Sequence, residues 1–186
     1  MISLTDGMIL YHGSYTEVSQ IQLEKCSKGK DFGRGFYLTS SHSQAEKFIR
    51  LSYKKQIRLK NIPEDTASGY ISIYKLHLSE KLTFKLFKSA DKEWLHFVAA
   101  NRDIDLFEDM LNQYKKTDII GGKIANDRTA RTLNAYIDGL FGEPGTKQAD
   151  DFAIQTLMPN RLEDQYCFRT EAAIAALEFI GSEYHV

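Results

Sequence analysis

The sequence has little of what marks disulfide-bonded, zinc-binding or membrane proteins. Its two cysteines, Cys26 and Cys167, lie far apart and form no CxxC or Cys/His cluster. A structural zinc site needs closely spaced thiolate and imidazole ligands, so we expect no metal. The first residues lack the basic and apolar regions of a secretion signal, and no apolar run approaches the roughly 20 residues of a membrane span. These absences predict a soluble, reduced, cytoplasmic protein without membrane contact.

The chain also lacks an excess of charge of either sign. Its 24 basic and 25 acidic side chains give a net charge of -1. Such a balance provides no broad attraction to phosphate backbones, so a nucleic-acid substrate would need a local basic patch. With 186 residues, 42% of them hydrophobic, the chain is long enough to bury a substantial core. We expect residues 1–186 to form a single domain.

Common catalytic motifs are missing as well. The sequence contains no Gly-x-x-x-x-Gly-Lys-Ser/Thr phosphate loop, no His-Glu-x-x-His and no Gly-x-Ser-x-Gly. It also shows no internal repeat and no low-complexity segment. Any function must therefore rest on a less common constellation of residues.

Short apolar runs and helical periodicities alternate along the chain, which predicts an α+β fold with helices flanking short strands. Ser41-x-x-Gln44 begins a capping box for a helix, and Asp91 can cap another. Residues 55–68 are expected to form a surface connection. The last helix is predicted to run from Thr170 through Ile180. Strands are expected over residues 8–12, 36–39, 70–78, 82–87, 117–120 and 165–169.

Two segments in the first quarter of the chain carry the clearest functional signal. Residues 10–14 read Leu-Tyr-His-Gly-Ser. This pattern predicts a short strand with His12 at its edge, followed by Gly13, whose lack of a side chain lets a ligand approach the backbone. Residues 31–39 read Asp-Phe-Gly-Arg-Gly-Phe-Tyr-Leu-Thr. Arg34, between the two glycines, suits a pyrophosphate group or is simply exposed to solvent. The other interpretation is a buried histidine at a strand end and a plain glycine turn.

Together these segments resemble the NAD-binding half of the ADP-ribosyltransferase superfamily, in the branch with His, Tyr and Glu on three strands. The Phe-Gly-Arg-Gly-Phe-Tyr of residues 32–37 is similar to the Phe-Gly-Lys-Gly-Ile-Tyr of eukaryotic poly-ADP-ribosyltransferases. The resemblance covers roughly residues 8–50 and 163–180, and implies a split-sheet core with NAD as substrate. The middle third looks more like a bacterial branch of stand-alone domains, sometimes encoded beside a small antitoxin-like partner.

The resemblance implies a role for each matching residue. The His12 imidazole would hold a hydroxyl of the adenosine ribose, and the Gly13 backbone would pair with the nicotinamide amide. Tyr37 and Phe48 would stack on the two faces of the pyridinium, gaining roughly 0.5–2 kcal/mol per ring. Both aromatics are otherwise ordinary core residues. The residues that the resemblance assigns to NAD are His12, Gly13, Ser14, Arg34, Gly35, Tyr37 and Phe48.

The third strand departs from the family pattern, because Gln165 stands where the catalytic glutamate is usual. Glutamine keeps a hydrogen bond to the nicotinamide ribose but supplies no negative charge, which argues against elongation into poly-ADP-ribose. Family members without this glutamate are single-unit transferases or inactive, and a structural Gln165 is a further alternative. Glu163, on the same side of an extended strand, is expected to orient the acceptor or to be a solvated loop acid.

The sequence thus predicts a mono-ADP-ribosyltransferase, a glycosyltransferase with His12, Tyr37, Glu163 and Gln165 at its catalytic site. It would move one ADP-ribose from NAD to a protein or nucleic-acid acceptor, and a toxin with an antitoxin partner is one form implied by the resemblance. The alternative is a catalytically silent module that binds NAD or ADP-ribose and acts through a protein partner. An RNA phosphate-removing relative would need a basic cluster that the sequence does not reveal. Residues 126–128 (Asn-Asp-Arg) either line the pocket or cap a helix.

Overall fold

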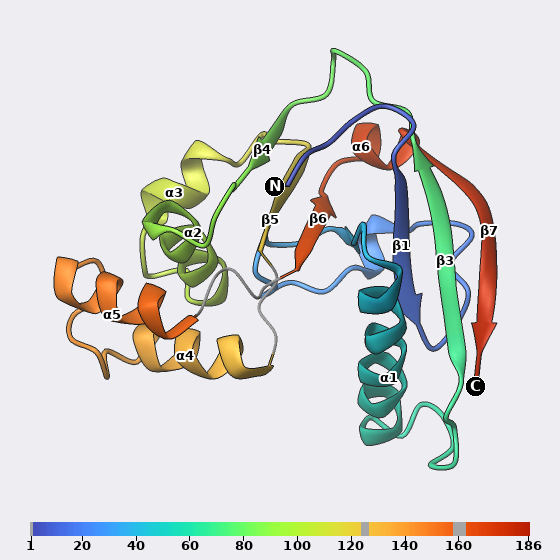
Figure 1. Cartoon of the computed structure of the whole chain (residues 1–186), viewed down its shortest axis with the longest axis horizontal. Helices are drawn as coiled ribbons and strands as arrows, with labels where there is room; N and C mark the ends of the chain where they lie inside the picture. Colours follow the sequence, from blue (N-terminus) through green and yellow to red (C-terminus); the bar gives the residue numbers. More distant parts are fainter. Residues whose placement is uncertain (1, 124–126, 158–162) are drawn as a thin grey trace.

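The described residues form a mixed α+β domain of two β-sheets and six α-helices (Figure 1). The structure is a computed structural model that describes residues 2–123, 127–157 and 163–186, with only the backbone at 127 and 128. The strands are β1 Ile9–Ser14, β2 Phe36–Leu38, β3 Gly69–Leu76, β4 Phe84–Leu86, β5 Ile119–Lys123, β6 Asp164–Phe168 and β7 Leu177–His185. The helices are α1 His42–Arg58, α2 Lys92–Arg102, α3 Glu108–Gln113, α4 Asp127–Ile137, α5 Lys147–Leu157 and α6 Glu171–Ala175. The α+β class expected from the sequence is confirmed.

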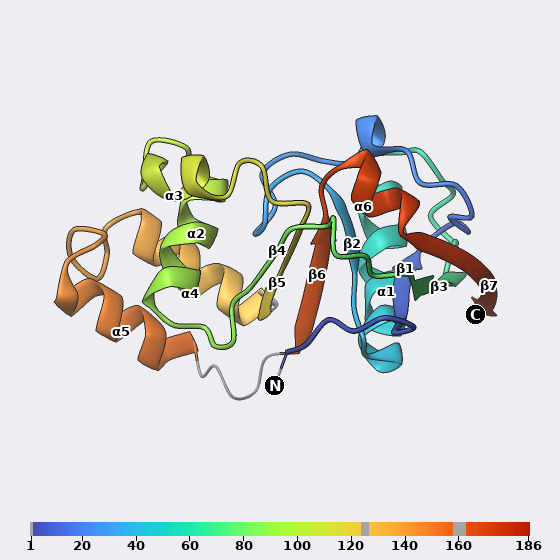
Figure 2. The same ribbon diagram turned by 90° about the horizontal axis from the view of Figure 1, so that it is seen from above.

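The two sheets meet along one short edge. One sheet has the strand order β1-β3-β7 and the other β2-β6-β5-β4. The backbone N–H of Tyr11 donates to the carbonyl of Thr39 (2.8 Å), and the N–H of Thr39 donates back to Tyr11 (3.0 Å). Figures 1 and 2 show the three-stranded sheet with α1 at one end of the molecule and α2 to α5 gathered at the other. The two halves therefore touch where β1 passes the end of β2.

Helix α1 packs directly against β1, and glycine at position 13 makes this possible. A Cβ there would lie 1.7 Å from the Ala45 carbonyl oxygen. The predicted cap is confirmed, because the Ser41 hydroxyl accepts a hydrogen bond from the Gln44 N–H (3.3 Å). The helix continues to Arg58, so residues 55–58 were wrongly expected to be a surface connection. Lys, Gln, Ile and Arg all tolerate a helix, and no breaker occurs before Pro63.

Strand β5 runs through two glycines that the sequence suggested would follow the strand. A Cβ at Gly121 would lie 2.7 Å from Leu86, and one at Gly122 would lie 2.9 Å from the Phe32 ring. Both faces of this central strand therefore press against large side chains. Here glycine provides space for packing, whereas the sequence pattern predicted that the strand would end at residue 120.

The C-terminal segment contradicts the prediction of one long helix. The helix begins at Thr170 as expected, with the Thr170 hydroxyl accepting from the Ala173 N–H (3.2 Å) as its cap, but it ends at Ala175. Leu177 then begins β7, which pairs antiparallel with β3 and places Phe179 against Tyr74 with ring centroids 5.8 Å apart. Pairing with a strand about 100 residues earlier overrides the local helix propensity, and a sequence pattern alone does not contain that pairing.

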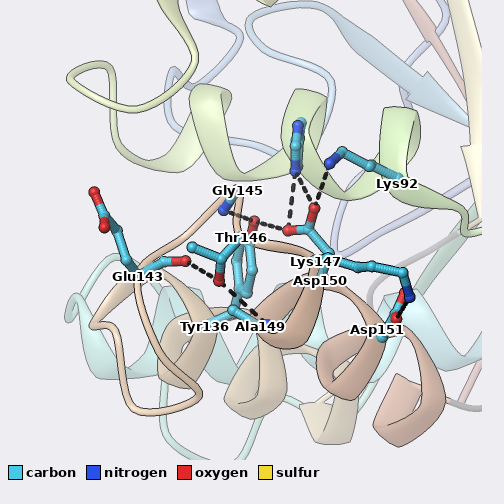
Figure 3. A network of polar contacts seen from close by, with 10 residues as sticks. Lys92, Tyr136, Glu143, Gly145, Thr146, Lys147, Ala149, Asp150 and Asp151 are labelled. Atoms are coloured by element: carbon cyan, nitrogen blue, oxygen red, sulfur yellow. Dashed lines mark hydrogen bonds and ion pairs between the residues drawn. The ribbon is translucent and has the colours of Figure 1, made fainter.

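A buried polar network holds α2, α4 and α5 together (Figure 3). The Asp150 carboxylate is 1% exposed and accepts hydrogen bonds from the Tyr136 hydroxyl (2.5 Å) and from His96 Nε2 (3.0 Å). Lys92 Nζ lies 2.9 Å from the same carboxylate. Asp91 caps α2 as predicted, through the Trp94 N–H (3.1 Å). No helix among the described residues is long and apolar enough to cross a bilayer.

Candidate functional site

Residues from β1, β2 and β6 and from α1, α2 and α4 line a common cleft of about 710 Å³. Its size falls within the 300–1,000 Å³ usual for small-molecule sites. The residues singled out in the sequence that line this cleft are His12, Gly13, Gly35, Tyr37, Phe48 and Gln165.

The His12 imidazole connects β1 to β2 at the cleft wall. Its Nδ1 lies 2.8 Å from the Tyr37 carbonyl oxygen, and its ring packs on Phe36 with centroids 4.5 Å apart. Burial lowers the pKa of His12 below its usual value, although the hydrogen bond to the Tyr37 carbonyl acts in the opposite direction. A neutral imidazole that donates from Nδ1 leaves Nε2 unprotonated. The site therefore offers an acceptor suited to a ligand hydroxyl.

The Gly13 backbone presents a donor and an acceptor at an open strand edge. Tyr11 directs both of its backbone polar groups to Thr39, away from β3. Backbone groups alternate in direction along a strand, so Gly13 directs its N–H and C=O to the same side as Tyr11. A primary amide, with one acceptor and two donors, matches such a pair. Gly13 thus serves the packing of α1 and also leaves a polar edge in the cleft.

The Tyr37 side chain is fixed by its hydroxyl group. This hydroxyl donates to the Gly33 carbonyl (2.7 Å) and accepts from the Phe32 N–H (3.0 Å). Burial, together with the neighbouring Cys167, raises the pKa of Tyr37 well above its usual value, so the phenol stays neutral. The ring lies nearly parallel to that of Phe32, at an interplanar angle of 14°. A ring held in this way offers a rigid aromatic surface to the cleft.

Gln165 places an uncharged side chain where the resemblance implies a catalytic glutamate. It lies on β6 opposite Gly122 and is 6% exposed. Its amide provides both a donor and an acceptor, without charge. Within the described ranges, Asp31 is the one carboxylate that lines the cleft, and Arg102 Nη2 pairs with it at 2.7 Å. The cleft therefore holds no uncompensated negative charge among these residues.

Three other residues from the sequence analysis do not line this cleft. The Ser14 hydroxyl lies 3.4 Å from that of Ser52, between β1 and α1. Arg34 Nε donates to the Leu23 carbonyl (3.2 Å), and its side chain lines a separate hollow. Glu163 precedes β6, with Oε1 3.6 Å from Lys47 Nζ. Asn126 lies outside the described residues, as do the side chains at 127 and 128, so the interpretation of residues 126–128 stays a prediction.

Sequence reasoning missed a cluster of cations in the cleft. Lys25, Lys30, Lys55 and Arg102 all line it, against the single acid Asp31. Four positive charges and one negative leave a local excess of three, although the whole chain carries a net charge of -1. These cations come from segments far apart in the sequence, so no local sequence pattern predicts that they lie together. Such a lining favours anionic ligands.

Comparison with protein families places the chain in one family. The chain belongs to DUF3990, described as a protein family of unknown function, whose model matches residues 8–179. No curated protein matches the chain. The match covers all the residues that line the cleft and every strand except the end of β7.

Proposed function

We propose that this DUF3990 protein binds NAD in the cleft and transfers one ADP-ribose to a macromolecular acceptor, releasing nicotinamide. The observation that carries the proposal is the convergence of His12, Tyr37 and Gln165, from three separate strands, on one cavity. The two small sheets that meet at this cavity support an ADP-ribosyltransferase-like split core.

The nicotinamide end of NAD fits the wall formed by β1, β2 and α1. The carboxamide would pair with the N–H and C=O of Gly13, which lie at the open strand edge. Its ring, a cation in oxidised NAD, would lie against the aromatic surfaces of Tyr37 and Phe48, both of which line the cleft. Cation-π attraction contributes roughly 0.5–2 kcal/mol per ring, and the reduced, neutral cofactor would lose it. The site is therefore proposed to favour NAD over NADH.

The adenosine and pyrophosphate end fits the remaining polar groups. The unprotonated Nε2 of His12 would accept a hydrogen bond from a ribose hydroxyl. The cations Lys25, Lys30 and Lys55 would balance the two negative charges of the pyrophosphate. This assignment replaces Arg34, whose side chain lines a different hollow.

The proposed reaction breaks the bond between C1′ of the nicotinamide ribose and the ring nitrogen. The bonding electron pair leaves with nicotinamide, which becomes neutral, and positive charge develops on the ribose. A nucleophile of the acceptor then forms the new bond at C1′ and releases its proton. Gln165 would hold a ribose hydroxyl through its amide oxygen, without the charge of a glutamate. Without that charge the activation barrier is higher, and each additional barrier of about 1.4 kcal/mol lowers the rate tenfold. We therefore expect slow, single-unit transfer.

The second candidate is a catalytically silent module that binds NAD or ADP-ribose and acts through a protein partner. Two features favour it: the neutral Gln165 and the pairing of Asp31 with Arg102. Neither supplies negative charge to a developing cation. The antitoxin-like partner and the acceptor role of Glu163 stay predictions.

One experiment distinguishes the two functions. The purified chain is incubated with NAD labelled in the nicotinamide and in the adenosine, with and without cell lysate. Transfer predicts labelled nicotinamide in solution and adenosine label on a macromolecule, which mass spectrometry then identifies. NAD binding without nicotinamide release over days would support the silent module. Absence of NAD binding would contradict transfer, and absence of binding to both NAD and ADP-ribose would contradict both functions.

A further inference from the structure

A second group of side chains with ligand chemistry lies outside the cleft. His42, Glu183 and His185 each bring one ligand atom to a common point, and these atoms lie within 4.8 Å of one another. None of the three lines the cleft, although the His42 ring contacts that of Tyr11, which does (centroids 5.2 Å apart). The cluster joins the first residue of α1 to the end of β7.

The fold explains why these side chains meet. Glu183 and His185 are two residues apart on β7, so both project from the same face of the sheet. Helix α1 begins at His42, directly after its Ser41 cap, and packs on β1 and on β3, the strand that pairs with β7. A separation of 141 residues between His42 and Glu183 explains why the sequence showed no ligand cluster.

The distances are close to those of a metal centre. His42 Nε2 lies 2.6 Å from Glu183 Oε2, and His185 Nε2 lies 3.4 Å from the same oxygen. Bonds of about 2.0–2.1 Å in a tetrahedral site place ligand atoms roughly 3.3 Å apart. The three side chains are 42%, 47% and 27% exposed, in the order His42, Glu183, His185, so they have room to adjust by side-chain rotation.

We propose that His42, Glu183 and His185 form a binding site for a divalent transition-metal ion, with the fourth position open to water. Two imidazoles and one carboxylate suit Zn²⁺, Ni²⁺ or Cu²⁺, whereas Ca²⁺ and Mg²⁺ prefer sets of oxygen ligands.

A bound ion would fasten the N-terminus of α1 to β7. Because α1 also supplies Phe48 and Lys55 to the cleft, the ion would hold in place a helix that forms one cleft wall. An ion that binds only the folded chain raises its stability. The site itself does not depend on NAD binding, so the two proposals can fail separately.

The chain contains a matched control for this site. His77 and Glu178 form a pair with the same 2.6 Å separation, also at the edge of β7, and both are about half exposed. This pair has no place in a three-ligand group among the described residues. If a single His-Glu pair were enough to bind an ion, substitution of His77 would weaken metal binding as much as substitution of His42.

The test is calorimetric titration of the full chain with ZnCl2, together with thermal unfolding and the visible absorption of added Co²⁺. We expect one Zn²⁺ per chain, a raised Tm and no response to Ca²⁺ or Mg²⁺. Loss of groups that only support a metal ligand weakens binding roughly 10- to 100-fold, so H42Q and H185Q should each lose at least that much. The H77Q variant should bind as the natural chain does.

Several results would overturn the proposal. These are absence of Zn²⁺ binding to the natural chain, undiminished binding in both H42Q and H185Q, or an equal loss in H77Q. Circular dichroism of each variant shows whether it is folded. Should H42Q fail to fold, H185Q decides the question, because its side chain projects from an edge strand.

Discussion

The proposed NAD site depends on a few side chains that hydrogen bonds within the chain hold in place. His12 bonds to the Tyr37 carbonyl, and the Tyr37 hydroxyl bonds to Gly33 and Phe32. Each side chain is thus held in position before a ligand arrives. Such preorganisation lowers the entropic cost of binding.

Replacing either residue by alanine should weaken NAD binding while the fold is retained. H12A removes one hydrogen bond, which corresponds to about 2- to 10-fold in Kd. Y37A removes one stacked ring, which corresponds to roughly 2- to 30-fold. Calorimetry measures the Kd, and Y37F, which keeps the ring, is the control. Unchanged affinity in both folded alanine variants would overturn the assignment of the site.

A substitution at residue 165 tests the chemical step apart from NAD binding. We expect Q165E to raise the hydrolysis of NAD by water by at least about tenfold, because a carboxylate stabilises the positive charge that develops on the ribose. The release of labelled nicotinamide measures this rate, with Q165A as the matched control. A rate that does not change in Q165E would argue against a position for this residue beside the nicotinamide ribose.

At the scale of helices and strands, the helical half depends on one buried carboxylate. Burial raises the pKa of Asp150, but the hydrogen bonds from Tyr136, Lys92 and His96 outweigh this effect and leave the pKa below its usual value. A lowered folded-state pKa means that the carboxylate stabilises the fold above its unfolded-state pKa. This stabilisation is lost as the pH falls through the folded-state pKa.

D150A should therefore destabilise the chain strongly. Removing one partner of a buried ion pair costs about 3–5 kcal/mol, since the Tyr136 hydroxyl and the His96 imidazole lose the buried carboxylate that accepts from them. Urea unfolding measures the free energy, and D151A is the matched control on the same helix. Asp151 pairs with Lys147 on the surface and is half exposed, so its loss should cost less than about 1 kcal/mol (Figure 3). Equal costs would contradict the structural role of the network.

The features that the sequence predicted correctly at this scale were helix starts, which depend on residues close together in the sequence. Ser41 and Asp91 each cap a helix as the sequence indicated, and α6 begins where expected, after Thr170, because a helix start depends on contacts between residues three apart. Strand β7 was missed, because its stability comes from pairing with β3 and not from its own residues. The continuation of β5 through Gly121 and Gly122 was missed for a similar reason. Only the packed neighbours reveal that these positions have no room for a side chain.

At the scale of the whole molecule, the same distinction applies to the candidate site. The motif residues His12, Tyr37 and Gln165 were found from sequence, and the structure brings them to one cleft. The cations Lys25, Lys30 and Lys55 were not found, since their proximity arises only when loops and α1 fold around β2. Arg34 was expected beside the ligand, but its neighbours along the chain could not show which way its side chain points.

A crystal structure of the chain grown with saturating NAD tests the proposed NAD site most directly. We expect NAD in the cleft between the sheets, with its carboxamide on the Gly13 backbone, its nicotinamide ring against Tyr37 and a ribose hydroxyl on His12. NAD bound elsewhere on the molecule, or a cleft that stays free of it at saturation, would contradict the central claim.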